Sequence, residues 1–400
     1  MTAEASSDEA GKLSPWDRIV LVGLFPLFAA RWLITFALNK SPGLHWRQRL
    51  ALTFLQAQRA AFPIRHLRWL TRRVSTGEAV VRYCSKNKIP HKSVVIDSPA
   101  AASSIEGVPA ATFHLLTVPT VEENAPGRTF LYFHGGGFVN PLRDVAHMPF
   151  IMQCAEACHA RQAVILEYAL APEHPYPAQL VQCVSTLQYL LGEMKLRPED
   201  VVLAGDSAGG QLVGALLAHL AQPSPYAAAI KVDGQFRAAL FVSPFVRMPP
   251  DEGSYEANHG KDYLNRPQVD RFMSAWKGSK DEVWANLCGV EQGADIWKLV
   301  FARGRGRGRG RGDRGLVPKA MVTVGTSEVF LECCRSFAKE HVGAETVFVG
   351  RETDCRVLGG MDRVLAECEA EVHVQAALDC AVGYNEGAMQ RAIASWLAGL

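Results

Sequence analysis

Hydrophobic positions along the chain fall into short apolar runs that alternate with longer segments of helical periodicity. Most runs are rich in Val, Ile, Leu or Phe and bounded by Gly or Pro, as in strands whose two faces are both covered. The amphipathic stretches 152–160 and 180–194 predict helices between strands. The alternation favours one mostly parallel sheet with helices on both faces. Strands are predicted at 93–97, 111–118, 129–134, 163–168, 201–204, 238–242, 320–324 and 345–349.

Two segments do not follow this alternation. Within residues 41–90, the stretch 45–75 is basic and amphipathic, and residues 245–300 form a helical insertion that contains tryptophans. Both predict helices that cap the α/β domain. The expected organisation is therefore a hydrophobic segment at 1–40, cap helices at 41–90 and an α/β domain at 91–400.

The N-terminal segment 19–39 carries one charged side chain, Arg31, and is long enough to span a bilayer. Pro26 and the central arginine oppose a simple span. The acid-rich residues before it oppose a cleaved signal peptide. Two interpretations stay open: a membrane anchor or in-plane hairpin, and a helix that covers the α/β domain. The expected location is accordingly a membrane, such as that of the endoplasmic reticulum, or the cytoplasm.

Net charge adds little, because the value of +2 depends on one arginine-glycine run at 303–315. Without that run, 36 basic residues face 39 acidic ones, so no nucleic-acid partner is expected. The run itself predicts an exposed flexible loop, with an RNA-binding segment as the alternative. The ten cysteines form no CxxC pair, which disfavours a zinc site. Buried free thiols are favoured, and one or two disulfides remain an alternative.

The stretch 201–210, VVLAGDSAGG, carries the first chemical signal. It reads as strand, then G-x-S-x-G, then an apolar helix, which is the context of a nucleophile elbow. The tight turn presents the hydroxyl of Ser207 above the positive end of a helix. Asp206 is expected to support this turn. A plain Gly-Ser turn before a helix is the structural alternative.

The second signal is LYFHGGGFV at 131–139. Three consecutive glycines cost more conformational freedom than a turn needs, so bare backbone must approach something closely. Acyl transfer from an ester creates an oxyanion, which backbone N–H donors stabilise. We expect this oxyanion hole at Gly135, Gly136 and Gly137 together with Ala208. His134 is expected to be a strut for the loop, and a merely flexible loop is the alternative.

These motifs resemble a known family. HGGG, then YALAPE at 168–173 with Pro175 and Pro177, then GDSAGG are similar to the hormone-sensitive-lipase branch of α/β-hydrolases. Arylacetamide-deacetylase-like and fungal steryl-acetyl-hydrolase-like enzymes are relatives in that branch. The resemblance covers residues 90–400. It implies the α/β-hydrolase fold, here with an eight-stranded sheet and a helical cap, no cofactor, and hydrolysis of carboxylic esters with modest acyl groups.

Such folds order their catalytic residues as Ser, acid, His. After the strand at 320–324 the family pattern has two acids four residues apart, usually Asp first, and this chain has Glu328 and Glu332. Glu328 is the preferred acid. Glu332, Asp354 and Asp362 remain alternatives.

The base is expected to follow one more strand, and residues 369–375 resemble the short strand end at which the family has its histidine, so His373 is the expected base. His341 precedes the last predicted strand and is expected on a solvated helix surface. The interval from the acid to His373 is longer than usual, and residues 351–367 are interpreted as an insertion.

Taken together, these residues predict a Ser-His-Glu esterase or lipase acting on small lipophilic esters. Phe138, Trp276, Trp284 and Trp297 are expected near the pocket, with plain packing as the alternative. Amide hydrolysis of lipophilic arylamides and a non-catalytic binding protein on the same scaffold are the competing functions. No metal is expected, and the oligomeric state is not predicted.

Overall fold

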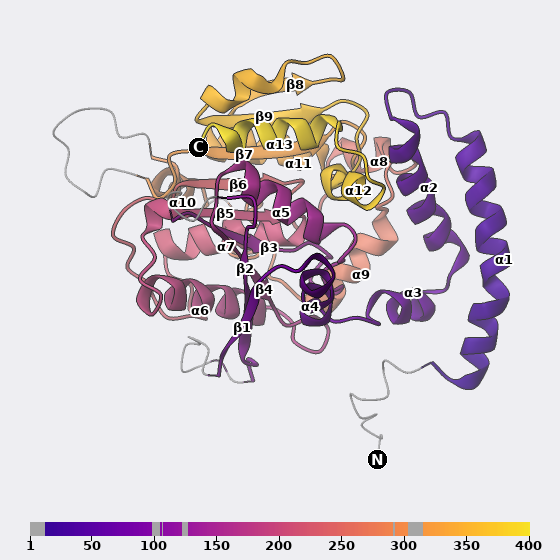
Figure 1. Cartoon of the computed structure of the whole chain (residues 1–400), viewed down its shortest axis with the longest axis horizontal. Coiled ribbons are helices and arrows are strands. Elements are labelled where there is room, and N and C mark those ends of the chain that lie inside the picture. Colours follow the sequence, from indigo (N-terminus) through magenta and orange to yellow (C-terminus); the bar gives the residue numbers. More distant parts are fainter. Residues whose placement is uncertain (1–12, 98–104, 106, 122–126, 291–292, 303–314) are drawn as a thin grey trace.

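The computed structural model describes residues 13–97, 105, 107–121, 127–290, 293–302 and 315–400 (Figure 1). The arginine-glycine run lies outside the described residues except for Gly315. Its predicted flexibility therefore stays a prediction.

The described chain forms one mixed sheet in the order β1-β2-β4-β3-β5-β6-β7-β9-β8. Strand β2 runs antiparallel to β1 and β4, and all the other neighbours are parallel. Each of the eight predicted runs overlaps a strand. The strands are β1 His91–Ile96, β2 Ala111–Thr117, β3 Thr129–Phe133, β4 Gln162–Glu167, β5 Val201–Asp206, β6 Ala238–Val242, β7 Ala320–Gly325, β8 Glu345–Val349 and β9 Arg363–Cys368.

The expectation of eight strands is wrong by one. Strand β9 lies between β7 and β8, and most of it falls in the segment that was interpreted as an insertion. Charged positions conceal it in the sequence, because Arg363 and Glu367 interrupt the apolar run. Both are buried, and Glu367 is neutralised by a bidentate contact with Arg335.

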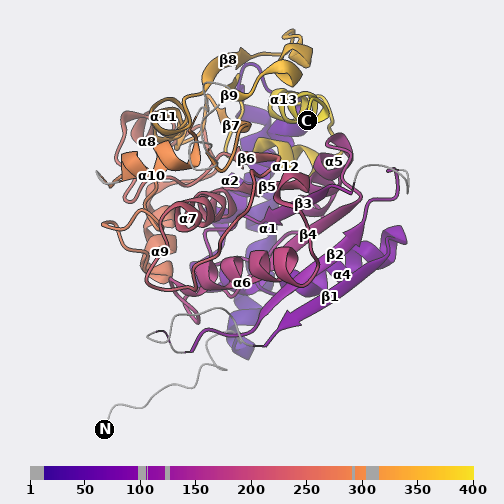
Figure 2. The same ribbon diagram turned by 90° about the vertical axis from the view of Figure 1, so that its left-hand side faces the viewer.

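Helices cover both faces of the sheet (Figure 2). Side chains of β3 alternate between the two resulting cores: Phe130 and Tyr132 join one, and Leu131 and Phe133 join the other. The first core is shared with α5 His147–Ala157, α12 Gln375–Ala381 and α13 Ala388–Ala398. The second is shared with α6 Ala178–Gly192, α7 Ala208–Ala221, α10 Gly293–Val300 and α11 Leu331–Ser336.

Further helices come from the hydrophobic N-terminal segment and from the two segments outside the α/β alternation. They are α1 Pro15–Leu38, α2 Trp46–Ala61, α3 Ile64–Thr71, α4 Thr76–Asn87, α8 Gly253–Ala257 and α9 Arg266–Trp276. Helices α1, α2 and α3 stand together beside the main body (Figure 1). The assignment of α2 and α3 to a cap remains a prediction.

Helix α1 is amphipathic in its packing although it is apolar nearly all round. Leu21 and Phe28 are buried in a small cluster with Ala57 and Phe62. The opposite face exposes large apolar side chains, namely Trp16, Ile19, Val22, Leu27, Leu33 and Ile34. By length and composition, α1 could cross a membrane, which by itself is weak evidence for a span.

Candidate active site

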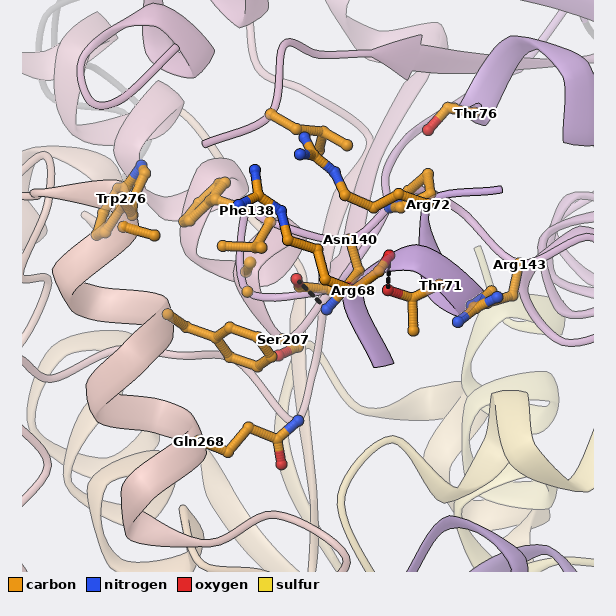
Figure 3. Close-up of a pocket in the computed structure, with 18 of the residues that line it drawn as sticks. Arg68, Thr71, Arg72, Thr76, Phe138, Asn140, Arg143, Ser207, Gln268 and Trp276 are labelled. Carbon is orange, nitrogen blue, oxygen red and sulfur yellow. Dashed lines mark hydrogen bonds between the residues drawn. The ribbon is translucent and has the colours of Figure 1, made fainter. Parts of the chain in front are cut away.

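Ser207 occupies a sharp turn between β5 and α7 and faces a large cavity (Figure 3). Its φ is +51°, a conformation that non-glycine residues rarely adopt. The turn closes because Gly205 and Gly209 lack side chains. A Cβ at Gly205 would collide with the carbonyl of Gly209, and a Cβ at Gly209 would collide with that of Phe133.

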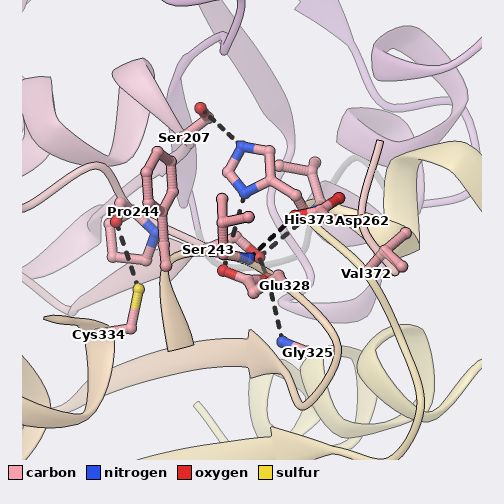
Figure 4. Close-up of polar contacts among 12 residues, drawn as sticks. Ser207, Ser243, Pro244, Asp262, Gly325, Glu328, Cys334, Val372 and His373 are labelled. Atoms are coloured by element: carbon pink, nitrogen blue, oxygen red, sulfur yellow. Dashed lines mark hydrogen bonds and ion pairs between the residues drawn. The ribbon is translucent and has the colours of Figure 1, made fainter. Parts of the chain in front are cut away.

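His373 follows strand β9 and lies at the same carboxyl edge of the parallel strands at which β5 ends before Ser207. Its Nε2 lies 2.9 Å from Ser207 Oγ, within hydrogen-bond distance (Figure 4). The residue lies in a turn before α12 and follows one more strand, β9, as the sequence predicted; that strand ends at Cys368, before the stretch 369–375.

Glu328 lies behind the imidazole and is completely buried. Its Oε2 accepts hydrogen bonds from Ser243 Oγ at 2.7 Å and from the Gly325 N–H at 3.0 Å. Its Oε1 lies 3.7 Å from His373 Nδ1. The structure thus brings Ser207, His373 and Glu328 into one row.

The alternative acids lie elsewhere. Glu332 accepts a hydrogen bond from the N–H of Ser254, and Asp354 and Asp362 are exposed. The alternative histidine, His341, was expected on a solvated surface. It is instead partly buried. Its ring contacts that of Trp297 and that of Phe337, which belongs to the same π-helical turn, Phe337–Val342.

Two side chains in this row escaped the sequence analysis. Ser243, at the end of β6, donates to Glu328 and accepts from the N–H of Val374, so it links the acid to the histidine turn. Asp262 is buried, and its Oδ2 accepts from the N–H of Val329. Burial raises the pKa of Asp262 to about 6, the charge of His373 lowers it and that of Glu328 raises it. In the sequence, the position of Ser243 at the end of a predicted strand was the one feature that could have pointed to its role. No sequence feature pointed to Asp262.

The glycine loop lies beside Ser207, and one expectation about it needs correction. The N–H of Gly135 donates to Asp206 Oδ1 at 2.8 Å, so Gly135 is not a free donor. Asp206 requires this bond because it is a buried carboxylate. Gly136 and Gly137 have φ of +123° and +63°. Among the hydrogen bonds of the described residues, none uses the N–H groups of Gly136, Gly137 or Ala208 as donors.

Asp206 and His134 hold the loop in place. Asp206 also accepts from Tyr132 Oη at 2.6 Å and lies 3.4 Å from His147 Nε2, a partner that the sequence did not reveal. His134 Nδ1 is 2.7 Å from the Gly135 carbonyl, and its ring stacks on Tyr168. Burial lowers the pKa of His134 to about 4, the nearby His147 adding to the effect, so it is a neutral strut at pH 7.

The cavity above Ser207 has a volume of about 1360 Å³. Helices α2, α3 and α9 contribute to its wall, together with the glycine loop. Phe138 and Trp276 line it and stack on each other with ring centroids 4.4 Å apart. Trp284 and Trp297 do not line it: Trp297 packs against Phe337 in the core, and so plain packing explains it.

In the described part of the chain, no group of three or more His, Cys, Asp or Glu side chains is arranged to hold a metal ion. Each of the ten cysteines, all of which lie in described segments, is a free thiol.

Comparisons with known proteins agree with this fold. A family model described as alpha/beta hydrolase fold matches residues 130–362, more than half of the chain. Among curated proteins, the carboxylesterase/phospholipase LipF of Mycobacterium tuberculosis is 31% identical over 173 residues, 42% of each chain. Arylacetamide deacetylase of Mus musculus is 30% identical over 166 residues, 40% of each chain. The matched stretch thus spans about two-fifths of these relatives.

Solved structures are similar in fold over a longer stretch. An esterase from the bacterial hormone-sensitive lipase family has a TM-score of 0.60 at 21% identity, covering 89% of this chain and 98% of that one. Carboxyl esterase 2 of Tuber melanosporum has a TM-score of 0.57 at 14% identity, covering 78% and 87%. Such identities concern the fold alone. The match to the family model over more than half of the chain shows that the chain belongs to the alpha/beta hydrolase fold family.

Proposed function

We propose that the chain is a serine esterase that hydrolyses carboxylic esters with modest acyl groups. The observation that carries the proposal is the 2.9 Å contact between Ser207 Oγ and His373 Nε2 beside three N–H groups that have no hydrogen-bond acceptor among the described residues. A nucleophile, a base within hydrogen-bond reach and preorganised donors are the parts that acyl transfer requires. The relatives named as esterases support the same chemistry.

In the proposed mechanism, neutral His373 Nε2 takes the proton of Ser207 as Oγ attacks the ester carbonyl. The negative charge develops on the carbonyl oxygen, where the N–H groups of Gly136, Gly137 and Ala208 stabilise it. The imidazolium then gives its proton to the leaving alcohol, and an acyl-enzyme remains. Water, deprotonated by His373, attacks this ester and releases the acid.

Glu328 is proposed to stabilise the imidazolium and to orient the ring. It is a positioning residue, because the substrate meets only the opposite edge of His373. Ser243 and Gly325 fix its other oxygen, so the carboxylate keeps one orientation while Oε1 faces His373 Nδ1. This arrangement follows the order Ser, acid, His in which the fold places its catalytic residues along the chain, with glutamate as the acid.

The test compares wild type with Ser207→Ala on p-nitrophenyl acetate and butyrate. We expect the variant to lose turnover by at least about 10³-fold with an unchanged circular dichroism spectrum. A fluorophosphonate probe should label wild type and not the variant, which separates an esterase from a binding protein on the same scaffold. Retained turnover in Ser207→Ala would refute the assignment.

Amide hydrolysis is the second candidate, and the similarity to arylacetamide deacetylase favours it. The same nucleophile and donors serve both reactions, so only relative rates can decide between them. We propose that the ester reaction dominates. Side-by-side kcat/KM values on phenyl acetate and acetanilide test this, and a higher value for the anilide would reverse the assignment.

We further propose that α1 attaches the protein to a membrane surface. Its outer face exposes apolar side chains that no other part of the described chain covers, among them Val22, Leu33 and Ile34. An interfacial helix of this kind buries such a face at the lipid boundary. The attached protein would then present its cavity, whose lining includes Leu13 and Asp17 near the start of α1, close to lipophilic esters.

A further inference from the structure

Arginine dominates the charged wall of the cavity. Four carboxylates also line the wall, so positive charge is in excess. A cavity with low-dielectric walls concentrates such a field. The lining arginines are Arg59, Arg68, Arg72, Arg73, Arg143 and Arg271.

The carboxylates of the wall are already engaged by other partners. Glu173 accepts hydrogen bonds from both Arg68 and Arg72. Glu167 accepts from the N–H of Gly77 and contacts His114. The other two are also occupied: Asp17 caps α1 through Ser14, and Asp206 holds the glycine loop. None of these four contacts Arg143.

Arg143 is the cation that stands out. It is partly buried in the cavity wall, and among the described residues its guanidinium has neither an ion-pair partner nor a hydrogen-bond acceptor (Figure 3). The adjacent Asp144 pairs with Arg82 at 3.3 Å. Burial lowers the pKa of Arg143, and the charge of the adjacent Asp144 raises it. A partly buried charge without a direct ion pair is costly, and an anion in the cavity would lower that cost.

The backbone of Arg143 is tied to the nucleophile turn. Its N–H donates to His147 Nδ1 at 2.9 Å, and His147 Nε2 lies 3.4 Å from Asp206 Oδ2. Asp206 directly precedes Ser207. One side chain, that of His147, therefore joins the Arg143 backbone to the residue that precedes Ser207, so the backbone position of Arg143 is fixed relative to the nucleophile turn.

Arg59 of α2 adds a second cation in the same wall. Its guanidinium lies 4.5 Å from the ring centroid of Tyr263, and its Nη1 is buried without a hydrogen-bond partner. Burial lowers the pKa of Arg59 to about 10, so it remains charged at pH 7. Among the described residues, Arg143 and Arg59 are thus the two lining arginines that are at least partly buried and form no ion pair with a carboxylate.

We propose that the cavity takes esters that carry an anionic oxo-acid group, a carboxylate or a phosphate, and that Arg143 binds this group. The inference rests on the proposed ester hydrolysis and names the substrate class of that site. The planar guanidinium offers two parallel N–H donors to either group. Phe138 and Trp276 then contact the apolar remainder of the substrate.

The kinetic test uses two p-nitrophenyl esters of the same shape, the hemisuccinate and the neutral 4-methylpentanoate. We expect Arg143→Gln to lower the ratio of kcat/KM values, hemisuccinate over 4-methylpentanoate, at least about tenfold. The ratio in Arg143→Lys should fall between those of wild type and Arg143→Gln, because lysine keeps the positive charge and loses the two parallel N–H donors of the guanidinium. A ratio in Arg143→Gln within about twofold of wild type overturns a carboxylate site.

Two control variants distinguish a direct contact between Arg143 and the substrate anion from the general electrostatic field of the cavity. Arg68→Gln removes a cavity cation that already pairs with Glu173, and Arg356→Gln removes an exposed one that pairs with Asp354. We expect the ratio of the two esters to stay near the wild-type value in both. An equal fall in Arg68→Gln and Arg143→Gln would mean that the field of the cavity, and not a site at Arg143, selects the charge.

A binding measurement keeps the inference independent of catalysis. In the Ser207→Ala background, titration calorimetry compares monoethyl succinate with diethyl succinate, and 1-butyrylglycerol 3-phosphate with 1-butyrylglycerol. Arg143→Gln should weaken binding of one anionic ester at least about tenfold, which identifies the group as carboxylate or phosphate. If it weakens neither, the proposal fails. If wild type hydrolyses no ester and this loss still appears, only the proposed reaction is wrong.

Discussion

Nδ1 of His373 lies 3.7 Å from Oε1 of Glu328, and both atoms are buried without a hydrogen-bond partner. The other oxygen of Glu328 is held by Ser243 and Gly325. The acid is therefore oriented by the protein and faces the imidazole across a gap that exceeds hydrogen-bond length. Closure of this gap when His373 becomes positively charged would bring the two into contact at the moment when that contact lowers the energy most.

Replacement of Glu328 by Gln tests this relationship. The amide keeps the shape and removes the charge that would stabilise imidazolium, so kcat for p-nitrophenyl butyrate should fall by about 10²–10⁴-fold. Glu332→Gln is the matched control, because Glu332 bonds to Ser254 and makes no contact with His373. A large loss in Glu332→Gln with little in Glu328→Gln would show that the acid is misassigned.

Gly136→Ala tests the backbone donors. An added Cβ would lie 2.5 Å from the Asn140 carbonyl oxygen at a φ of +123°, so the loop must move and its N–H groups with it. We expect kcat to fall by about 10²–10³-fold. Gly192→Ala, where a Cβ meets no atom within 4 Å, should keep full activity. Undiminished kcat in Gly136→Ala would exclude this loop from oxyanion stabilisation.

A buried acid pair predicts how stability depends on pH. Gln48 Nε2 donates to both Glu371 and Asp379, at 3.0 and 2.9 Å, and thereby joins α2 to the segment around His373. Burial raises the pKa of Glu371, and burial together with the charge of Glu371 raises that of Asp379. Arg391 opposes the shift at Glu371.

The folded state therefore holds protons that the unfolded state releases at the ordinary pKa values of 4.5 and 3.8. The pair's contribution to stability is complete below those values and is lost as pH rises through the raised ones. We expect Tm to be about 2–4 °C lower at alkaline than at mildly acidic pH, and Asp379→Asn to flatten this slope. Asp354→Asn, at an exposed site, should leave it unchanged. An equal slope in Asp379→Asn contradicts the assignment.

The outer face of α1 predicts membrane association. Val22, Leu33 and Ile34 are 68%, 66% and 59% exposed. Their joint replacement by Gln should reduce co-sedimentation with phospholipid vesicles at least about tenfold, because each side chain loses lipid contact. Gln at the exposed Val145 and Phe348 provides the control. A wild-type protein that stays in the supernatant would rule out the attachment.

Local sequence patterns predicted most strands of this protein and the main residues of its candidate site. Apolar runs marked eight strands, because burial on both faces leaves an unbroken hydrophobic pattern. The turn around Ser207 and the loop at Gly136 were also found, since a strained turn and a close backbone approach each demand glycine at fixed spacing. The motif order then led to His373 and Glu328, which the structure brings together.

Tertiary structure decided what depends on partners distant in the chain. Strand β9 was concealed because Arg363 and Glu367 become buried only when the fold supplies partners. The N–H of Gly135 is consumed by Asp206, and Arg143 lacks a counter-charge in the cavity because each lining carboxylate is engaged elsewhere. Periodicity and motifs report what a segment buries or how it turns. Hydrogen-bond satisfaction and charge balance are properties of an enclosed space, whose walls come from segments hundreds of residues apart.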